Sequence, residues 1–337
     1  MRIAIDAREA LGSSPSGKGF FAKKVIEEFK ARNTDLLLLG KEGDGLLWHK
    51  KTAKMLIKDR GADLYLSPTS YIVPWLLKEK FPYALVVHDL IAWHHEPHNR
   101  KAKLIERLTL KRALKNAKHI FTVSEATKDE LLHYFPGTEL RKIKTIYEGP
   151  TITQLQHERA KPGEVTILCA GTLCPRKNQA RLIYAFNALP DHAKVSAKLI
   201  FIGARGWHDD EILRLVQNSP NVEWRGYVSN TERDELLKHA TIFAYPSLSE
   251  GFGLPVLDAM MMGIPVLTSN RSSMKEITGD AAILVNPDSK EDIAKGLERI
   301  LMDHELQRSL RVKGQEQAQK FSWKRTVDLM LEALNGM

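Results

Sequence analysis

The stretch Ile242–Asp258, IFAYPSLSEGFGLPVLD, combines a short β-rich run, a loop with a Gly-Phe-Gly motif and the start of a helix. The two glycines allow backbone N–H groups to approach a ligand closely, and Pro255 suits the first turn of a helix. A helix that starts in this way favours anions, because its N-terminus presents free N–H groups and the positive end of the helix dipole. We expect Glu250 and Asp258 to face the same cleft from loop and helix; the alternative for each is a solvated or helix-capping acid.

A second stretch of similar design is Thr166–Asn178, TILCAGTLCPRKN. A glycine after its β-rich run allows a turn, and a helix is expected from Gln179. Arg176 and Lys177 are adjacent cations near that helix start, and their mutual repulsion is costly without a counter-anion. The pair therefore predicts an anionic ligand. The alternative is that both side chains point into solvent.

Short β-rich runs alternate with amphipathic helical patterns along the whole chain of 337 residues. The runs are residues 3–5, 36–39, 64–66, 84–87, 120–123, 143–146, 166–170, 199–202, 222–224, 242–245, 265–267 and 282–285. This alternation is typical of βαβ units and parallel sheets, and the chain length favours two domains. The sequence therefore predicts an α/β protein with two doubly wound sheets.

The boundary between the two domains is expected in residues 149–164, which are polar and have no clear period. We assign residues 1–150 to the first domain and residues 151–321 to the second, with the last helix, 322–337, returning to the first. Ligands of open parallel sheets bind beyond the carboxyl ends of the strands. The expected site is therefore a cleft between two facing domains.

Charge is distributed unevenly along the chain. The first 150 residues contain 27 Lys and Arg against 18 Asp and Glu, which accounts for the whole net charge of +9. An anionic partner is therefore expected for this half, either a membrane surface or a nucleic acid. No membrane span, secretory signal or zinc spacing is found, and the two cysteines are too few for a disulfide framework. These features favour a protein inside the cell with reduced thiols and no metal.

Two basic amphipathic helices are expected in the first domain, at residues 48–60 and 100–118. Their apolar stripes, including Leu104, Ile105, Leu108 and Leu114 of the second helix, either face the core or contribute to a membrane surface. Tyr71–Leu77, YIVPWLL, is interpreted as an apolar loop, because proline is disfavoured in internal strands. Basic helices beside an apolar loop favour an anionic bilayer over a nucleic acid, since aromatic residues do not alternate with the basic ones.

Three further residues of the first domain are candidates for ligand binding. His88 follows the β-rich run 84–87, and its ring is expected to contact either a ligand or a backbone carbonyl. Gly17 and Gly19 lack the spacing of a dinucleotide fingerprint. They are interpreted as a flexible loop that meets a phosphate.

At these residues the sequence resembles a known family. The run 244–260, AYPSLSEGFGLPVLDAM, and the run 263–269, GIPVLTS, are similar to the donor-binding signature of family-4 retaining glycosyltransferases of the GT-B fold. Residues 171–178, 202–207, 226–228, 5–8, 87–89 and 123–125 support the resemblance, which covers nearly the whole chain. It is dense in the second domain and looser in the first, where the resemblance implies a variable acceptor.

The resemblance implies a role for each candidate residue. Lys177, helped by Arg176, would hold the donor diphosphate, Glu250 would lie against the sugar, and His88 would contact the sugar near the reacting carbon. Asp258 would bind the ribose in place of the family's usual Glu. The remaining implied donor-binding residues are Gly17, Gly19, Gly171, Thr172, Arg205, Tyr227, Gly251, Phe252, Gly253 and Leu254.

Two departures from the family pattern accompany these roles. Thr172 stands where many members have an arginine, for which Arg205 or Arg176 would substitute. Residues 147–150, Tyr-Glu-Gly-Pro, replace the family's usual Asn-Gly.

The implied activity is the transfer of a hexose from a nucleotide-diphosphate sugar, with retention and without a metal or other cofactor. The Pro-Arg-Lys-Asn form of residues 175–178 resembles mannosyl- and rhamnosyltransferases, which suggests GDP-mannose. The expected acceptor is a lipid-linked saccharide or cell-surface polysaccharide at the cytoplasmic face of the membrane. The alternatives are a GT-B nucleotide-sugar epimerase and a basic nucleic-acid-binding protein.

Overall fold

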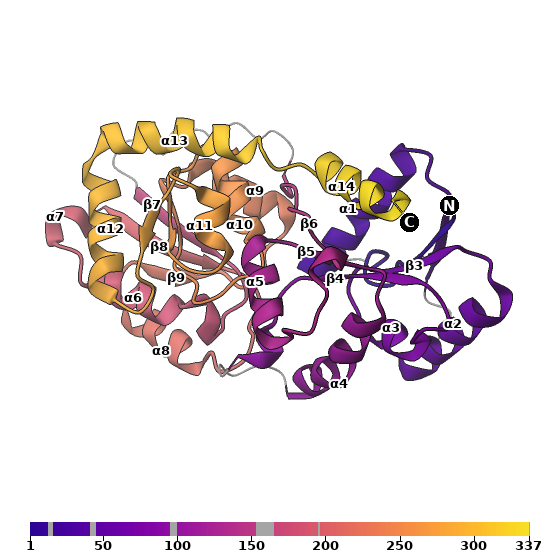
Figure 1. Ribbon diagram of the computed structural model, residues 1–337. Coiled ribbons are helices and arrows are strands. Elements are labelled where there is room, and N and C mark those ends of the chain that lie inside the picture. The colour runs from indigo at the N-terminus through magenta and orange to yellow at the C-terminus, as the bar shows by residue number, and fades with distance from the viewer. Residues whose placement is uncertain (13–15, 41–44, 95–99, 153–164, 195, 337) are drawn as a thin grey trace. The chain divides into compact units, whose positions relative to one another are not determined.

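The computed structural model describes residues 1–12, 16–40, 45–94, 100–152, 165–194 and 196–336, so most of the expected boundary segment, 149–164, lies outside it. These residues form two compact units. Unit 1 comprises Met1–Gly149 and Ser322–Met337, and unit 2 comprises Pro150–Phe321. Each contains a six-stranded sheet with parallel neighbouring strands (Figure 1). The prediction of two doubly wound sheets is confirmed.

Every β-rich run predicted in the first half is a strand of unit 1. The strands are β1 (Ile3–Asp6), β2 (Leu36–Leu39), β3 (Leu64–Ser67), β4 (Tyr83–Val87), β5 (His119–Thr122) and β6 (Ile143–Thr145). They are ordered β2-β1-β3-β4-β5-β6. Strands β1, β3 and β4 are buried along their whole length, because helices cover both faces of a parallel sheet.

The helices of unit 1 lie on the two faces of this sheet. They are α1 (Gly17–Ala31), α2 (Gly45–Asp59), α3 (Ile72–Leu77), α4 (Arg100–Asn116), α5 (Glu125–Tyr134) and α14 (Trp323–Asn335), with 3-10 turns η1 (Ile91–Trp93) and η2 (Leu140–Lys142). Helix α14 packs on α1, whereas α3 contacts both α2 and α4 on the other side of the sheet (Figure 1). The C-terminal helix thus completes one face of unit 1.

The interpretation of Tyr71–Leu77 as an apolar loop is wrong. Residues Ile72–Leu77 form helix α3, with Val73, Pro74 and Leu77 buried in the core of unit 1. Proline is tolerated here because it lies in the first turn, where no intrahelical N–H bond is required. The apolar side chains of this segment therefore stabilise the fold.

The two basic helices differ in what their apolar residues do. In α2, Trp48 and Leu56 are buried and the lysines are exposed, as expected for a core-facing helix. In α4, Leu110, Ala113 and Leu114 are buried, as is Thr109. Leu104, Ile105 and Leu108 are instead 59%, 46% and 64% exposed. At 3.6 residues per turn the exposed apolar residues lie opposite the buried ones, so a core-facing role for them is wrong.

The strands of unit 2 also correspond to the predicted runs. They are β7 (Val165–Ala170), β8 (Ala197–Ile202), β9 (Val222–Trp224), β10 (Ile242–Tyr245), β11 (Val266–Ser269) and β12 (Ile283–Val285). Their order is β12-β11-β10-β7-β8-β9. Strands β8 and β9 follow β7 on one side of the sheet, and strands β11 and β12 follow β10 on the other side. The topological switch point therefore lies between the neighbouring strands β7 and β10.

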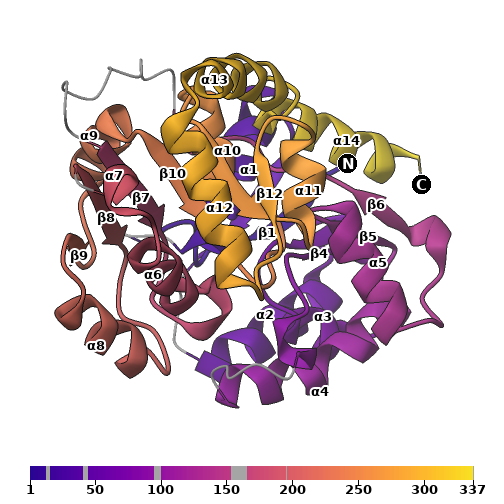
Figure 2. The same ribbon diagram turned by 90° about the vertical axis from the view of Figure 1, so that its left-hand side faces the viewer.

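Helices cover both faces of the second sheet (Figure 2). They are α6 (Gln179–Asn187), α7 (Asp191–Lys194), α8 (Asp210–Asn218), α9 (Asn230–His239), α10 (Leu254–Met261), α11 (Ser273–Thr278), α12 (Lys290–Met302) and α13 (His304–Ala318), with a 3-10 turn η3 (Pro175–Lys177). Helix α12 packs on α6, and α13 packs on α10 and α11. Within the described residues, no helix has the length and apolar character needed to cross a bilayer.

Candidate functional site

The loops that follow β7 and β10 carry the two segments singled out from the sequence. Because β7 and β10 are adjacent and parallel, the loops at their carboxyl ends, 171–178 and 246–253, emerge side by side. This is the switch point of unit 2, the position where doubly wound sheets bind ligands. The strand order therefore brings together residues more than seventy positions apart.

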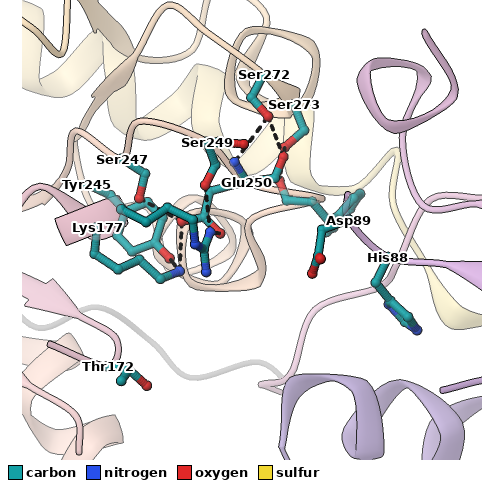
Figure 3. A network of polar contacts seen from close by, with 12 residues as sticks. His88, Asp89, Thr172, Lys177, Tyr245, Ser247, Ser249, Glu250, Ser272 and Ser273 are labelled. Carbon is teal, nitrogen blue, oxygen red and sulfur yellow. Dashed lines mark hydrogen bonds and ion pairs between the residues drawn. The ribbon is translucent and has the colours of Figure 1, made fainter. Parts of the chain in front are cut away.

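Glu250 pairs with both cations of the neighbouring loop, and Figure 3 shows its contact with Lys177. Lys177 Nζ donates to Glu250 Oε1 at 2.7 Å, and Arg176 forms an ion pair with Glu250 Oε2 at 2.9 Å. Arg176 also donates to the carbonyl oxygen of Ser249 at 2.6 Å. Glu250 supplies the counter-anion that the two adjacent cations were expected to need. The alternative, in which both cations point into solvent, is wrong.

Tyr245 and Ser247 complete the network. Lys177 also donates to the hydroxyl oxygen of Tyr245, and its Nζ lies 4.8 Å from the centre of the Tyr245 ring. The Ser247 hydroxyl donates to Glu250 Oε1 at 2.6 Å. Sequence analysis did not single out these two residues. Their positions in the sequence could have identified them, because Tyr245 is the last residue of strand β10 and Ser247 lies at the start of the loop that contains Glu250.

Burial and charge act in opposite directions on Glu250. Burial alone would raise the pKa of its carboxyl group, but the nearby Arg176 and Lys177 outweigh burial and hold this pKa at about 2. Burial, aided by repulsion from Arg176, lowers the pKa of Lys177 even though Glu250 attracts a proton to it. With all three side chains in their ionised forms, the group of Arg176, Lys177 and Glu250 has a formal net charge of +1.

The Gly-Phe-Gly loop is held by the start of α11. The backbone N–H of Glu250 donates to the Ser272 hydroxyl at 3.1 Å, and the Ser273 hydroxyl donates to the Phe252 carbonyl at 2.7 Å. Gly253 has a φ of +110° and precedes α10, which begins at Leu254. Only glycine adopts this backbone without strain, so the motif directs the chain into the helix.

Asp258 faces the segment that enters unit 2. Its Oδ1 accepts the backbone N–H of Thr151 at 2.7 Å, and its Oδ2 accepts the Thr151 hydroxyl at 2.5 Å. Burial raises the pKa of this carboxyl group, although the hydrogen bonds oppose the shift. The shorter side chain thus anchors the chain at Thr151, and its implied contact with a ribose stays a prediction.

The other candidates of unit 2 surround the β7 and β8 loops. Gly171 (φ +146°) and Gly203 (φ +137°) allow these loops to touch, because a Cβ at Gly203 would overlap the Gly171 carbonyl oxygen. The Thr172 carbonyl accepts a hydrogen bond from the side chain of Gln179 at 3.0 Å. The side chain of Arg205 is 56% exposed and donates two hydrogen bonds to the carboxylate of Asp209.

In unit 1, the structure places His88 at the carboxyl end of β4. Its Nε2 lies 2.8 Å from the carbonyl oxygen of Pro68, which is the backbone contact considered from the sequence. Gly17 and Gly19 lie in the first turn of α1, where the Ser16 hydroxyl accepts the N–H of Gly19. The interpretation of these glycines as a flexible loop is wrong. The capping hydrogen bond from Gly19 to Ser16 stabilises a helix that already begins at Gly17.

Comparisons with known proteins identify the family. Residues 14–151 match the family model "Glycosyltransferase Family 4", and residues 151–317 match "Glycosyl transferases group 1". The chain is 30% identical over 294 residues to the O-antigen chain mannosyltransferase B of Escherichia coli, covering 82% of this chain and 75% of that protein. This chain is a family 4 glycosyltransferase.

The glycosyltransferase has further relatives among mannosyltransferases. It is 27% identical to the O-antigen chain mannosyltransferase RfbU of Salmonella typhimurium, over 69% of this chain and 63% of that protein. It is 28% identical to the serotype-specific mannosyltransferase WbdA of Escherichia coli, of whose length it spans 29%.

Solved structures establish the GT-B fold of the glycosyltransferase. Anabaena Alr3699/HepE, crystallised with UDP and glucose, matches with a TM-score of 0.77 at 17% identity, covering 100% of both chains. WaaG, a glycosyltransferase involved in lipopolysaccharide biosynthesis, matches with a TM-score of 0.72 at 17% identity and 98% coverage of both chains. The fold implied by the sequence resemblance is confirmed.

Within this glycosyltransferase, the structure brings together some of the candidate residues and separates others. Lys177, Arg176 and Glu250 form one buried network, whereas Arg205 turns to Asp209 and Tyr227 is 70% exposed. Among the residues that the structure describes, no three His, Cys, Asp or Glu side chains are grouped to hold a metal ion. The roles of the candidates in donor binding, and the absence of a metal requirement, stay predictions.

Proposed function

We propose that this glycosyltransferase moves a hexose, with mannose as the first candidate, from a nucleotide-diphosphate sugar to a growing polysaccharide or lipid-linked saccharide. The observation that carries the proposal is the buried network of Lys177, Arg176 and Glu250 at the switch point of unit 2. A group with one excess positive charge at this position suits a diphosphate. The two O-antigen mannosyltransferase relatives support mannose and hence GDP-mannose.

The chemistry follows from charge development. When the bond between the anomeric carbon and the phosphate oxygen breaks, its electron pair stays on the phosphate. Lys177 and Arg176 stabilise this negative charge, and no metal ion is required. The acceptor oxygen forms the new bond on the same face of the sugar and its proton passes to the leaving phosphate, so the anomeric configuration is retained. Glu250 orients both cations and stabilises positive charge on the sugar.

The remaining candidates have supporting roles in this proposal. Backbone N–H groups of the Gly-Phe-Gly loop, from Phe252 to Leu254, contact phosphate or sugar oxygens, and the start of α1 approaches the phosphates. His88 contacts the sugar. Arg205 and Tyr227, whose side chains are exposed, contact the nucleotide.

Replacement of Lys177 by alanine tests the mechanism. Removing one such donor costs about 2.7–4 kcal/mol of barrier, so kcat is expected to fall about 100- to 1000-fold. The matched control is Lys295→Ala, at an exposed lysine of α12 in the same unit. Turnover is followed by release of the nucleoside diphosphate, with fold checked by circular dichroism. Near-normal turnover of the Lys177 variant would contradict the mechanism.

A panel of nucleotide sugars tests the donor. Only the true donor is expected to raise the melting temperature strongly, because binding to the native state alone stabilises it. The anomeric proton coupling of the product reports retention, and turnover after chelation reports metal independence. Formation of an isomeric nucleotide sugar without any acceptor would indicate an epimerase instead. Binding to DNA or RNA with a steep salt dependence, and indifference to nucleotide sugars, would indicate a nucleic-acid-binding protein.

We also propose that unit 1 binds the inner, anionic face of the cytoplasmic membrane through helix α4. Its exposed Leu104, Ile105 and Leu108 share a helix face with Lys111 and Lys115. A surface hollow beside this face is lined by Trp75, Lys78, Glu79, Lys80, Arg107, Leu108, Lys111, Arg112, Lys115 and Asn116. Apolar side chains surrounded by cations suit acyl chains beneath anionic headgroups.

Vesicle flotation tests this surface. Each cation near an anionic bilayer contributes about 1 kcal/mol, so changing Lys111, Arg112 and Lys115 together to Gln is expected to weaken binding about 100-fold. The control changes the exposed Lys50, Lys51 and Lys54 of α2 to Gln. Equal losses in both triple variants, or no flotation of the wild type at low salt, would refute the role of α4.

A further inference from the structure

Four polar side chains of unit 1 form a group that the proposed mechanism does not use. They come from the segments that follow β1, β3 and β4 and from helix α4, and we call them the edge cluster: Lys18, Tyr71, Asp89 and Glu106. Lys18 Nζ lies 3.7 Å from Asp89 Oδ2 and 3.7 Å from Glu106 Oε1. Strand β2 lies on one side of β1 and β3 on the other, so the switch point of this sheet is between β1 and β3. The segments that carry Lys18 and Tyr71 follow these two strands, which places the edge cluster where parallel sheets bind ligands.

Glu106 occupies the core-facing side of α4. Leu110 and Ala113 follow it by four and seven positions, which places all three on one side of the helix, and both apolar residues are fully buried. Glu106 thus continues the buried stripe of α4. Burial raises the pKa of its carboxyl group, although Lys18 opposes the shift. A carboxylate on this side of the helix is costly to the fold, so its position indicates a role in binding.

Tyr71 contributes a hydroxyl group that the protein itself does not use. The residue is only 5% exposed. Burial, aided by the negative charges of Glu106 and Asp89, raises its pKa well above the usual value, so the phenol lies close to both carboxylates. Within the part of the chain that the structure describes, no group forms a hydrogen bond with this hydroxyl. Leaving a buried hydroxyl unpaired is costly, and a ligand oxygen beside the carboxylates would pair it.

The charged members of the edge cluster are partly accessible and loosely paired. The side chains of Lys18, Asp89 and Glu106 are 31%, 22% and 21% exposed. The distances from Lys18 to the two carboxylates are longer than an ordinary hydrogen bond, so a ligand oxygen that comes between them gains contacts. A sugar hydroxyl fits, because it accepts a hydrogen bond from an ammonium or a phenol and donates its own proton to a carboxylate.

The sign of the charge distinguishes between classes of ligand. One ammonium and two carboxylates give the edge cluster a formal net charge of −1 when all three are ionised. The first 150 residues nevertheless carry the whole net charge of +9 of the chain. The anionic partner expected from that excess is therefore not expected here, since two carboxylates repel a phosphate. The backbone at the start of α1 is not part of the edge cluster. An uncharged saccharide meets no such repulsion.

We propose that the edge cluster binds hydroxyl groups of an uncharged acceptor saccharide. The inference rests on the proposed function, in which a hexose is transferred to a saccharide. Lys18 and Tyr71 donate hydrogen bonds to oxygen atoms of the acceptor. Asp89 and Glu106 accept protons from its hydroxyl groups. Asp89 directly follows His88, which contacts the donor sugar in the proposed function, so the bound acceptor lies beside the residue that meets the transferred hexose.

The test compares the wild type with Tyr71→Phe and Glu106→Gln, which keep the size of each side chain. The matched control is Glu27→Gln, at a glutamate of α1 whose side chain is 47% exposed. Transfer is measured with the nucleotide sugar that the donor panel identifies and with uncharged disaccharides of mannose, glucose, galactose and N-acetylglucosamine. Acceptor and donor are varied separately, so each variant gives a KM for both. Saturation-transfer difference NMR with the same disaccharides reports binding by the wild type without transfer.

The KM for the acceptor is expected to rise about 2- to 10-fold in Tyr71→Phe and about 10- to 100-fold in Glu106→Gln, because hydrogen bonds to charged groups are stronger. The KM for the donor should stay at the wild-type value in both, and Glu27→Gln should change neither. Because the Tyr71 hydroxyl has no partner in the free protein, Tyr71→Phe should not lower the melting temperature, whereas loss of a structural hydrogen bond would lower it.

An unchanged acceptor KM in Tyr71→Phe overturns the proposal, even if Glu106→Gln does not fold. A rise in the KM for the donor alone overturns it as well, because the cluster would then bind the donor. Absence of saturation transfer to every disaccharide also overturns it. Absence of transfer by the wild type with every nucleotide sugar, while a disaccharide still binds, would instead refute the proposed function.

Discussion

The buried carboxylate of Glu250 should make unit 2 sensitive to acid. The interval between an ordinary glutamate pKa of 4.5 and the value of about 2 in the folded protein corresponds to about 3 kcal/mol. Below pH 4.5 the unfolded chain takes up a proton at this residue before the folded chain does. The contribution of Glu250 is therefore complete above pH 4.5 and is lost as the pH falls toward 2.

Glu250→Gln removes this contribution at every pH. At pH 7 the variant leaves Arg176 and Lys177 without their carboxylate, and breaking a buried pair costs about 3–5 kcal/mol, which agrees with the value from the pKa. The difference in free energy of unfolding between wild type and variant is therefore expected to be largest at pH 7. It should narrow steadily below pH 4.5.

Amide hydrogen exchange of unit 2 peptides in urea, measured at pH values from 7 to 3, reports the stability of the unit that carries the network. The control is Glu316→Gln, at an exposed residue of α13 in the same unit. The free energy of unfolding of Glu316→Gln should equal that of the wild type at all pH values. Parallel curves for wild type and Glu250→Gln would refute the assignment of Glu250 as a buried, ionised partner of the two cations.

Three other substitutions or reactions give further checks. Gly203→Ala forces a Cβ onto the carbonyl of Gly171 at a φ of +137° and is expected to destabilise the protein by about 3 kcal/mol or more; an unchanged melting temperature would contradict this. Asp258→Asn keeps one oxygen that accepts the Thr151 N–H, and its amide N–H can donate to the Thr151 hydroxyl oxygen with the direction of that bond reversed, so its melting temperature at pH 7 should fall less than that of the alanine variant; equal losses would argue against this geometry. Burial raises the thiol pKa of Cys169 to about 12, so it should react with a disulfide reagent at pH 8 only after urea is added, and rapid native-state labelling would contradict its burial.

The strands were predictable because each is a short β-rich run between amphipathic helices. Such runs depend on local composition and on the helices that cover a parallel sheet. The first turn of α10 was predictable for the same local reason, since Gly253 and Pro255 define it. Twelve strands and the resulting fold class follow from patterns no longer than a few residues.

Contacts between distant loops were not predictable in the same way. The pairing of Lys177 with Glu250 depends on β7 lying beside β10, and no local pattern encodes that neighbour relation. Asp258 similarly meets Thr151, more than one hundred positions earlier. The role of the apolar residues of α4 stayed open between core and surface, because periodicity identifies two faces of a helix without saying which one the sheet covers. Helix α3 was missed because proline was judged without its position in the first turn.

The chain leaves unit 1 after Gly149 and returns to it at Ser322, and Gly149 lies against the backbone of Trp323. Exit and re-entry are thus almost one point on the surface of unit 1. A polypeptide inserted at such a point needs only closely spaced ends, so residues 150–321 behave as a cassette. Exchanging this cassette for that of a relative with another sugar nucleotide requires two cuts and no added spacer. Recombination at this junction is therefore a short evolutionary or engineering route to hybrid transferases that combine this unit 1 with the second unit of a relative.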